Sequence, residues 1–367
     1  MQPMRVAVVL GHWRNYGVET LVLNLFRHID KKRISFDFIV CDGTREEVPE
    51  QEIHSLGGRV FYVPQYTNIL KYKRRLVDLF RSNQYLIVHA HMSTLSVLPL
   101  WAAKSARVRV RIAHCHTMAG KGEHAKNVVK YFLRSLAKVF PTNYATSSRL
   151  AGKWLFGPRV PVHYVPVARE LSQLRFDPVR RLRMREQLQV SDRFVVGHFG
   201  RFVEQKNHLF LIDVFSEVLK TEPEAVLVLA GDGPLVDRVM SYARQKLPES
   251  SFLYLGIRSD TADLYQALDA FVLPSLYEGV PGTGIEAQAA GLPFIFSDAV
   301  TDEALIIDSA QRLPLTLGAS QWAKAICAHK GDIREDQDVR MREAGYEVSE
   351  AAENLARYYE RLVEDFI

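Results

Sequence analysis

Cysteine is scarce in this sequence, and long apolar runs are missing from it. The 367 residues contain three cysteines, Cys41, Cys115 and Cys327, which stand far apart. Their odd number and wide spacing exclude a disulfide framework and a CxxC zinc ribbon, and they favour a reducing compartment. No stretch approaches the roughly 18–20 apolar residues that a membrane-spanning helix requires. We therefore expect a cytoplasmic protein without a transmembrane helix.

Repeats and low-complexity tracts are absent as well. With 47% hydrophobic and 24% charged residues, the composition is that of a globular protein and excludes disordered, collagen-like and coiled-coil proteins. The length exceeds the roughly 100–200 residues of one domain, so we expect two domains.

Short apolar runs alternate with helix-period segments in both halves of the chain. The runs that predict strands are 5–10, 36–41, 59–63, 86–89, 110–114, 144–147, 194–199, 225–230, 252–255, 270–273 and 293–296. This alternation predicts an α/β fold with two doubly wound, Rossmann-like domains that each hold a parallel sheet. We place the N-terminal domain at residues 1–168, the C-terminal domain at 169–346, and a final helix at 347–367.

The first half of the chain is basic and the second half is acidic. Residues 1–165 hold 25 lysines and arginines against 10 aspartates and glutamates, whereas residues 166–367 hold 22 against 32. A basic half favours anionic partners such as nucleic acid, lipid head groups or anionic substrates. We do not expect nucleic acid, because RNP, KH and zinc-finger patterns are absent and aromatic residues are not interleaved with the basic clusters.

The segment 273–293 carries the strongest functional signal. A buried strand is followed by a loop rich in glycine and proline, and a helix of small residues opens near Thr283. Ligands of open α/β sheets bind at this carboxyl edge of the strands, and a helix N-terminus offers free N–H groups to a phosphate. Gly282 and Gly284 lack side chains, so a phosphate can approach the backbone there. Glu286, in the first helical turn, is placed to accept hydrogen bonds from a ribose diol.

Two cations follow another apolar strand. Arg201 and Lys206 stand in the segment 200–207, where a turn can bring both to the carboxyl edge of the sheet. A diphosphate would be neutralised there without a metal. Taken alone, Arg201 would be interpreted as one partner of a surface ion pair. Together with the loop at 273–293, the two cations favour a diphosphate site.

Together these motifs resemble the retaining GT-B glycosyltransferases of family 4. The resemblance rests on Glu278 and Glu286, on the Arg201 and Lys206 pair, on Gly-Asp-Gly-Pro at 231–234, and on the Gly-Val-Glu that starts at Gly17. It covers nearly the whole chain, and bacterial exopolysaccharide and lipopolysaccharide enzymes are most similar. The resemblance implies the GT-B fold, in which two Rossmann-like domains face each other across a cleft.

The resemblance also implies roles for individual residues. Arg201 and Lys206 match the residues that hold the donor diphosphate, which is the leaving group. Glu278 matches the carboxylate that contacts the sugar hydroxyls of the donor, and Glu286 matches the one that binds the ribose. The other implied donor-binding positions are Gly17, Gly256, Ile257, Arg258, Gly282, Thr283 and Gly284.

A histidine of the first domain completes the implied site. His116 resembles the family histidine near the donor sugar and the acceptor hydroxyl. The residues alone place His114 and His116 on one face at the end of a strand, so either could fill that role; we favour His116. With His89 and His91 these residues also allow a metal site. The first half has few acids to supply a carboxylate ligand, so we expect hydrogen-bonded histidines and no metal.

A stripe of cations recurs every four residues within 124–140. It consists of Lys126, Lys130, Arg134 and Lys138 and lies opposite an apolar side. An ordinary surface helix shows the same pattern, but the basic first half favours attraction to anionic lipid. Our hypothesis is that the first domain docks on the inner face of the plasma membrane to reach a lipid-linked acceptor.

The resemblance implies a metal-independent, retaining glycosyltransferase without a cofactor. Its donor would be a nucleoside-diphosphate sugar, with UDP as the commonest carrier among relatives. Its acceptor would be a glycan or a lipid-linked sugar in cell-surface polysaccharide synthesis. Two alternatives share the fold: a sugar-nucleotide 2-epimerase, which would release an epimerised nucleotide sugar, and a module that binds a nucleotide sugar without turnover.

Overall fold

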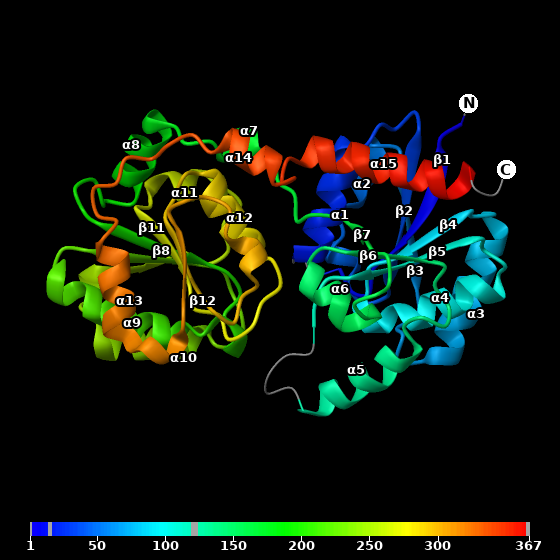
Figure 1. Cartoon of the computed structure of the whole chain (residues 1–367), viewed down its shortest axis with the longest axis horizontal. Helices are drawn as coiled ribbons and strands as arrows, with labels where there is room; N and C mark the ends of the chain where they lie inside the picture. Colours follow the sequence, from blue (N-terminus) through cyan, green and yellow to red (C-terminus); the bar gives the residue numbers. More distant parts are fainter. Residues whose placement is uncertain (1, 14–16, 119–123, 365–367) are drawn as a thin grey trace. The chain divides into compact units, whose positions relative to one another are not determined.

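The chain forms two compact units, Met1–Arg169 with Glu347–Ile367, and Glu170–Tyr346 (Figure 1). The computed structural model describes residues 2–13, 17–118 and 124–364, and the side chains of residues 124–127 lie outside this description. None of the helices in these ranges is both long enough and apolar enough to span a bilayer.

The first unit is built on a seven-stranded parallel sheet of order β3-β2-β1-β4-β5-β6-β7. Its strands are β1 (Met4–Val9), β2 (Ile34–Cys41), β3 (Arg59–Val63), β4 (Ile87–Ala90), β5 (Val110–Cys115), β6 (Asn143–Thr146) and β7 (His163–Tyr164). Its helices are α1 (Gly17–His28), α2 (Glu50–Ser55), α3 (Ile69–Ser82), α4 (Val97–Ser105), α5 (His124–Leu136), α6 (Arg149–Phe156) and α15 (Val348–Glu364). The central strands are buried on both faces, as a doubly wound sheet requires.

A carboxylate lies buried within this sheet. Asp37 of β2 is fully buried and accepts hydrogen bonds from Arg5, Arg59 and the Tyr85 hydroxyl. Its partners neutralise and satisfy it, which is the condition for burying a charge.

Helix α15 is at the end of the chain but packs in the first unit, against α1 (Figure 1). Its buried positions Val348, Ala351, Leu355 and Tyr359 recur every three or four residues, so they form one stripe along the helix. This stripe completes the core on the α1 side of the sheet.

The second unit is built on a six-stranded parallel sheet of order β10-β9-β8-β11-β12-β13. Its strands are β8 (Val195–Phe199), β9 (Val226–Ala230), β10 (Phe252–Tyr254), β11 (Ala270–Leu273), β12 (Phe294–Ser297) and β13 (Ala310–Leu313). Its helices are α7 (Leu171–Leu174), α8 (Pro178–Gln187), α9 (His208–Thr221), α10 (Val236–Lys246), α11 (Thr261–Ala267), α12 (Gly282–Ala289), α13 (Gly318–Cys327) and α14 (Asp338–Glu343). In this sheet the strand order reverses between β8 and β11.

Two strands were not predicted from the sequence, and both lie at a sheet edge. β7 has two residues, and β13 exposes Gln311 and Arg312. An edge strand is covered less than a central one, so it needs no continuous apolar run.

Helix α5 also differs from the expectation. It ends at Leu136 rather than near residue 140, and several side chains of its apolar side are exposed to solvent. Val128 is 70% exposed and Phe132 is 66% exposed, so this helix is not the ordinary packed helix of a doubly wound domain.

Candidate active site

The point where the strand order of the second unit reverses is flanked by two loops. One loop, 200–207, follows β8, and the other, 274–281, follows β11. The Leu276 N–H donates to Gln205 O (2.7 Å), and the Gln205 side chain donates to Tyr277 O (2.8 Å). The Asn207 amide donates to Pro274 O (3.1 Å). These bonds hold both loops together at the place where open α/β sheets bind ligands.

A lysine and a carboxylate meet between these loops. Lys206 Nζ lies 2.7 Å from Glu278 Oε1, with side chains 14% and 13% exposed. The Ser275 hydroxyl donates to the same oxygen over 3.2 Å. Arg201, also on the loop after β8, is exposed to solvent. The structure therefore brings Lys206 and Glu278 into direct contact, a pairing that their sequence separation does not reveal.

The N-terminus of α12 offers polar groups that have no partner. Pro281 is the N-cap residue, and no side chain caps the helix. Within the described chain, the N–H groups of Gly282 and Thr283 make no hydrogen bond. The Thr283 hydroxyl is buried and also lacks a partner there. Such a cluster of unsatisfied donors fits an anionic or hydroxylated ligand.

For Gly284, the prediction that the missing side chain lets a phosphate approach the backbone is wrong. Gly284 is buried, and its N–H donates to Pro281 O (3.0 Å), so it is not free for a phosphate. A Cβ at this position would lie 2.5 Å from Phe294 Cζ. The missing side chain serves helix-to-sheet packing rather than ligand approach.

Glu286 has a fixed orientation. The Tyr265 hydroxyl lies 2.9 Å from Glu286 Oε2 and 3.1 Å from Thr283 O. Tyr265 was not predicted as a site residue from the sequence, because a tyrosine within a helix such as α11 is normally interpreted as part of the core. Its position ties the predicted ribose-binding carboxylate to the first turn of α12.

The loops after β9 and β10 reach the same edge of the sheet. Gly231 has a φ of 132° and its N–H donates to Gly256 O (2.8 Å). A Cβ on Gly231 would lie 2.0 Å from Gly200 O, so only glycine fits this close approach. Ile257 is 79% exposed, and Arg258 forms an ion pair with Asp260 at 2.5 Å. This edge therefore presents an apolar side chain and a fixed backbone.

Two buried histidines next to this site were missed by sequence analysis. His198 Nδ1–H donates to Val272 O (2.8 Å), and His208 stacks on Phe202 with ring centroids 4.2 Å apart. Burial, with a smaller effect of Lys206, lowers the pKa of His198 to about 3. Both imidazoles are therefore neutral and leave Lys206 as the charged group.

The first unit places histidines at the carboxyl edge of its own sheet, where α1 begins at the exposed Gly17. His91 and His116 are the residues that directly follow β4 and β5. His114 is fully buried within β5, with Nδ1 at 3.1 Å from His89 Nε2 and Nε2 at 3.0 Å from Ser147 Oγ. His114 therefore has no nitrogen left for a ligand.

His89, His91 and His114 each form a hydrogen bond to a neighbouring histidine, and the three rings lie close together. Ligand nitrogens of His89, His91 and His114 all lie within 4.8 Å of one another. The rings of His89 and His114 are nearly parallel, at 13°, and their facing nitrogens are at hydrogen-bonding distance. The facing nitrogens of these two rings are engaged with each other, and the expectation of hydrogen-bonded histidines without a metal stays a prediction.

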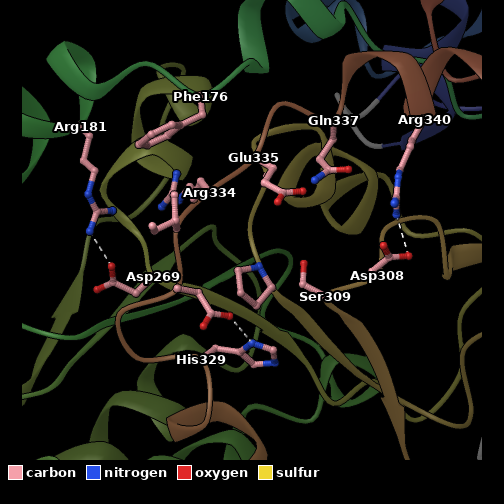
Figure 2. A pocket seen from close by; sticks show the side chains of 14 residues that line it. Phe176, Arg181, Asp269, Asp308, Ser309, His329, Arg334, Glu335, Gln337 and Arg340 are labelled. Atoms are coloured by element: carbon pink, nitrogen blue, oxygen red, sulfur yellow. Dashed lines mark hydrogen bonds and ion pairs between the residues drawn. The ribbon is translucent and has the colours of Figure 1, made fainter.

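A cavity of about 390 Å³ lies at the opposite edge of the second sheet. Asp269, Pro293 and Ser309 line it and directly precede β11, β12 and β13 (Figure 2). Charged groups around it pair with one another: Arg181 with Asp269 (2.5 Å) and Arg340 with Asp308 (2.6 Å). This cavity is separate from the loops that carry the candidate site.

Comparison with known proteins gives a consistent result. The family model of glycosyl transferases group 1 matches residues 193–330, and that of Glycosyltransferase Family 4 matches residues 16–188. EpsF of Bacillus subtilis (strain 168), named as a glycosyltransferase, is 36% identical over 341 residues, which are 88% of this chain and 86% of EpsF. The UDP-Gal:alpha-D-GlcNAc-diphosphoundecaprenol alpha-1,3-galactosyltransferase of Escherichia coli is 27% identical over 308 residues, 79% of this chain and 78% of that enzyme.

A solved structure shows the same fold over the full length. HepE of Anabaena in complex with UDP superimposes with a TM-score of 0.79 at 18% identity, and the match covers 98% of this chain and 100% of HepE. The crystal structure of WaaG, a glycosyltransferase involved in lipopolysaccharide biosynthesis, gives a TM-score of 0.69 at 13% identity, with 96% and 94% covered.

Proposed function

This chain belongs to the group 1 glycosyltransferases of family 4 and has their two-domain GT-B fold, and on that premise we propose its donor, stereochemistry and acceptor. The donor is a UDP-sugar, transfer retains the anomeric configuration without a metal, and the acceptor is a glycan or lipid-linked sugar. Two similar proteins support this choice: the Escherichia coli relative is named for UDP-Gal and a diphosphoundecaprenol acceptor, and HepE was crystallised with UDP.

We rest the donor site on the groups gathered around the switch point between β8 and β11. Lys206 carries a positive charge there, and the first turn of α12 adds the free N–H groups of Gly282 and Thr283 with the Thr283 hydroxyl. A helix N-terminus and a lysine both favour a diphosphate. Glu286, oriented by Tyr265, would accept hydrogen bonds from the ribose.

The same groups would stabilise the transition state of transfer. Negative charge that builds on the departing diphosphate would meet Lys206, Arg201 and the N-terminus of α12. The acceptor hydroxyl attacks the anomeric carbon from the face that the diphosphate leaves, and its proton passes to a diphosphate oxygen. Glu278 holds Lys206 and the Ser275 hydroxyl through Oε1, so we assign it to binding sugar hydroxyls rather than to nucleophilic attack.

Ligand-induced stabilisation tests the donor. Thermal shifts would be measured with UDP, GDP and ADP and their sugars, first with EDTA and then with Mg²⁺, because a ligand that binds only the folded state raises its stability. We expect a shift with UDP that EDTA does not remove and that Lys206→Ala abolishes. Lys220→Ala, which changes an exposed lysine on α9, is the matched control. A shift with GDP alone, or one that needs Mg²⁺, would refute the donor or the metal independence.

Product analysis tests the reaction type. With UDP-sugar and acceptor, release of UDP and an α-linked product from an α-linked donor, seen by NMR, would support retention. An epimerised nucleotide sugar would establish the epimerase instead, and binding without turnover for any acceptor tried would favour a binding module.

Helix α5 supports the proposal that the enzyme docks on an anionic membrane. Val128, Val129, Tyr131 and Phe132 are each more than half exposed. At 3.6 residues per turn Val128, Val129 and Phe132 lie away from the cationic stripe, whereas Tyr131 lies beside Arg134 and contacts Trp154 with ring centroids 6.2 Å apart. An exposed apolar side beside a cationic one is typical of helices that lie in the membrane interface.

The cationic stripe of α5 is partly engaged within the protein. The Arg134 guanidinium stacks over Trp154 at 5.2 Å, Lys138 is exposed, and the side chain of Lys126 lies outside the described residues. Each basic residue near an anionic surface adds about 1 kcal/mol of attraction.

Vesicle co-sedimentation tests this docking. We expect the protein to bind vesicles containing anionic lipid at low salt, and the double variant Val128→Ser, Phe132→Ser to bind at least tenfold more weakly. Val179→Ser, Leu182→Ser is the matched control, because these residues of α8 are 73% and 71% exposed but belong to the second unit. Equal binding by both variants, or no binding by the wild type, would refute the docking surface.

A further inference from the structure

Six buried or half-buried side chains of the first unit form one unbroken hydrogen-bonded chain. Five contacts link them, with lengths of 2.7, 3.1, 3.0, 3.2 and 3.2 Å. In order, the groups are the Tyr359 hydroxyl, His89, His114, the Ser147 hydroxyl, His116 and His91. The chain starts in α15 at the end of the sequence and crosses from β4 to β5 and then to the loops after β6, β5 and β4.

All four imidazoles in the chain are neutral. Burial holds the pKa values of His89, His91 and His114 well below the ordinary range, and it lowers the pKa of His116 to about 3. A neutral imidazole has one N–H donor and one acceptor nitrogen. Each ring can therefore pass a hydrogen bond in one direction only, and neighbouring rings must agree on that direction.

Tyr359 sets the direction. Its hydroxyl is buried, and its partner among the described residues is His89 Nδ1, at 2.7 Å. If His89 Nδ1 donated to the phenol oxygen, the phenol proton would have no acceptor, and an unmade buried hydrogen bond disfavours that arrangement by about tenfold or more. Tyr359 therefore donates, and His89 carries its proton on Nε2.

The remaining tautomers follow from that choice. His89 Nε2–H donates to His114 Nδ1, and His114 Nε2–H donates to Ser147 Oγ. The Ser147 hydroxyl donates to His116 Nδ1, and His116 Nε2–H donates to His91 Nδ1. His91 then carries its own proton on Nε2, which has no partner among the residues that the structure describes.

His91 stands where a ligand of this unit would bind. It follows β4, and its N–H donates to Val9 O at the end of β1 (2.9 Å). β1 and β4 are the neighbours between which the strand order of this sheet reverses, which is the ligand position in doubly wound sheets. His116, which we favoured from the sequence, has both ring nitrogens engaged inside the chain.

We propose that His91 donates its Nε2–H to a sugar or phosphate oxygen of a bound substrate. The positioning residues that fix this tautomer of His91 are the other five members of the chain: Tyr359, His89, His114, Ser147 and His116. The substrate contact rests on the proposed transfer reaction, whereas the tautomers do not. The two parts can therefore fail separately.

Histidine tautomers are measured directly by long-range ¹H–¹⁵N correlation on the ¹⁵N-histidine-labelled full chain near pH 7.5. Single His→Gln variants assign the resonances. We expect the Nε2–H tautomer at all four histidines in the wild type. In Tyr359→Phe, which keeps the ring that packs in the core, the bias is lost and both tautomers appear as far as His91. Tyr358→Phe, a neighbour that stacks on His163 outside the chain, should leave the tautomers unchanged.

Kinetics adds a second readout. If about half of the Tyr359→Phe molecules present the wrong tautomer, kcat/KM falls about twofold, while Tyr358→Phe keeps the wild-type value. Ser147→Ala cuts the chain in its middle and should disturb His116 and His91 but leave His89 unchanged. An Nδ1–H tautomer at any of the four histidines in the wild type would refute the chain, as would a Tyr359→Phe effect confined to His89. Correct tautomers with no transfer activity would leave the chain intact and refute the proposed function.

Discussion

Mild acid should destabilise the first unit more than the second. Five histidines of the first unit are buried or half-buried, namely His89, His91, His114, His116 and His163, and His198 and His208 are buried in the second unit. Burial lowers the pKa of each imidazole, to about 3 for His116 and His198, to about 4 for His163 and to about 2 for His208. In the unfolded chain each has a pKa of about 6.5.

The sign follows from where protons bind. Below pH 6.5 these histidines bind protons in the unfolded chain but stay neutral in the folded chain, so the free energy of unfolding falls as the pH falls. The loss continues until the folded pKa is reached, and carboxylates contribute little above pH 5. From pH 7 to pH 5 each such histidine removes about 2 kcal/mol. The five histidines of the first unit thus remove about 10 kcal/mol, and the two of the second unit about 4 kcal/mol.

Hydrogen exchange followed by mass spectrometry measures both units in one sample. Free energies of opening would be compared at pH 7, 6 and 5, with exchange rates corrected for their own pH dependence. His91→Gln should reduce the loss in the first unit by about 2 kcal/mol, whereas His54→Gln, at an exposed position of α2, should not change it. A loss below about 2 kcal/mol in the first unit would mean that the histidine cluster accepts protons while folded, and the reasoning would fail.

Three further changes test other parts of the structure. Lys206→Ala should lower kcat/KM about 10²- to 10³-fold by removing a charge that stabilises the leaving group, and Lys220→Ala should not; equal rates in both would refute the role of Lys206. Gly231→Ala should cost about 3 kcal/mol or more in urea unfolding, because its Cβ would lie 2.0 Å from a carbonyl oxygen of Gly200; a wild-type midpoint would contradict that close approach. Asp37→Ala should cost about 3 kcal/mol in the same assay, because it leaves two arginines and a tyrosine hydroxyl of the first sheet without their partner; a loss below about 1 kcal/mol would show that solvent replaces it.

Apolar periodicity predicted the central strands well because both faces of a doubly wound sheet are covered. The edge strands β7 and β13 were not predicted. β7 has only two residues, and in β13 the solvent-exposed Gln311 and Arg312 break the apolar pattern. The sequence left two interpretations of α5 open, an ordinary surface helix or a lipid-docking helix, because an amphipathic pattern shows that a helix has an apolar side but not what covers that side.

The candidate donor site was predictable as a set of loops, because parallel strands end at the same edge. Sequence spacing does not reveal the Lys206–Glu278 ion pair or the hydrogen bond from Tyr265 to Glu286, since each joins residues that only the strand order brings together. The histidine chain has the same origin. His89 and His114 meet because β4 pairs with β5, and Tyr359 arrives from more than two hundred residues away, with a sequence separation of 270 from His89.

The place of α15 has a consequence for the order in which the protein can fold during synthesis. Every residue of the second unit leaves the ribosome before Val348–Glu364 does, so that unit can close while the first still lacks a helix. Until then the face of α1 that α15 covers is open to water, and Tyr359 has not yet met His89. The apolar surface that stays exposed longest during synthesis therefore belongs to the first unit, and a chaperone that binds the growing chain would bind there.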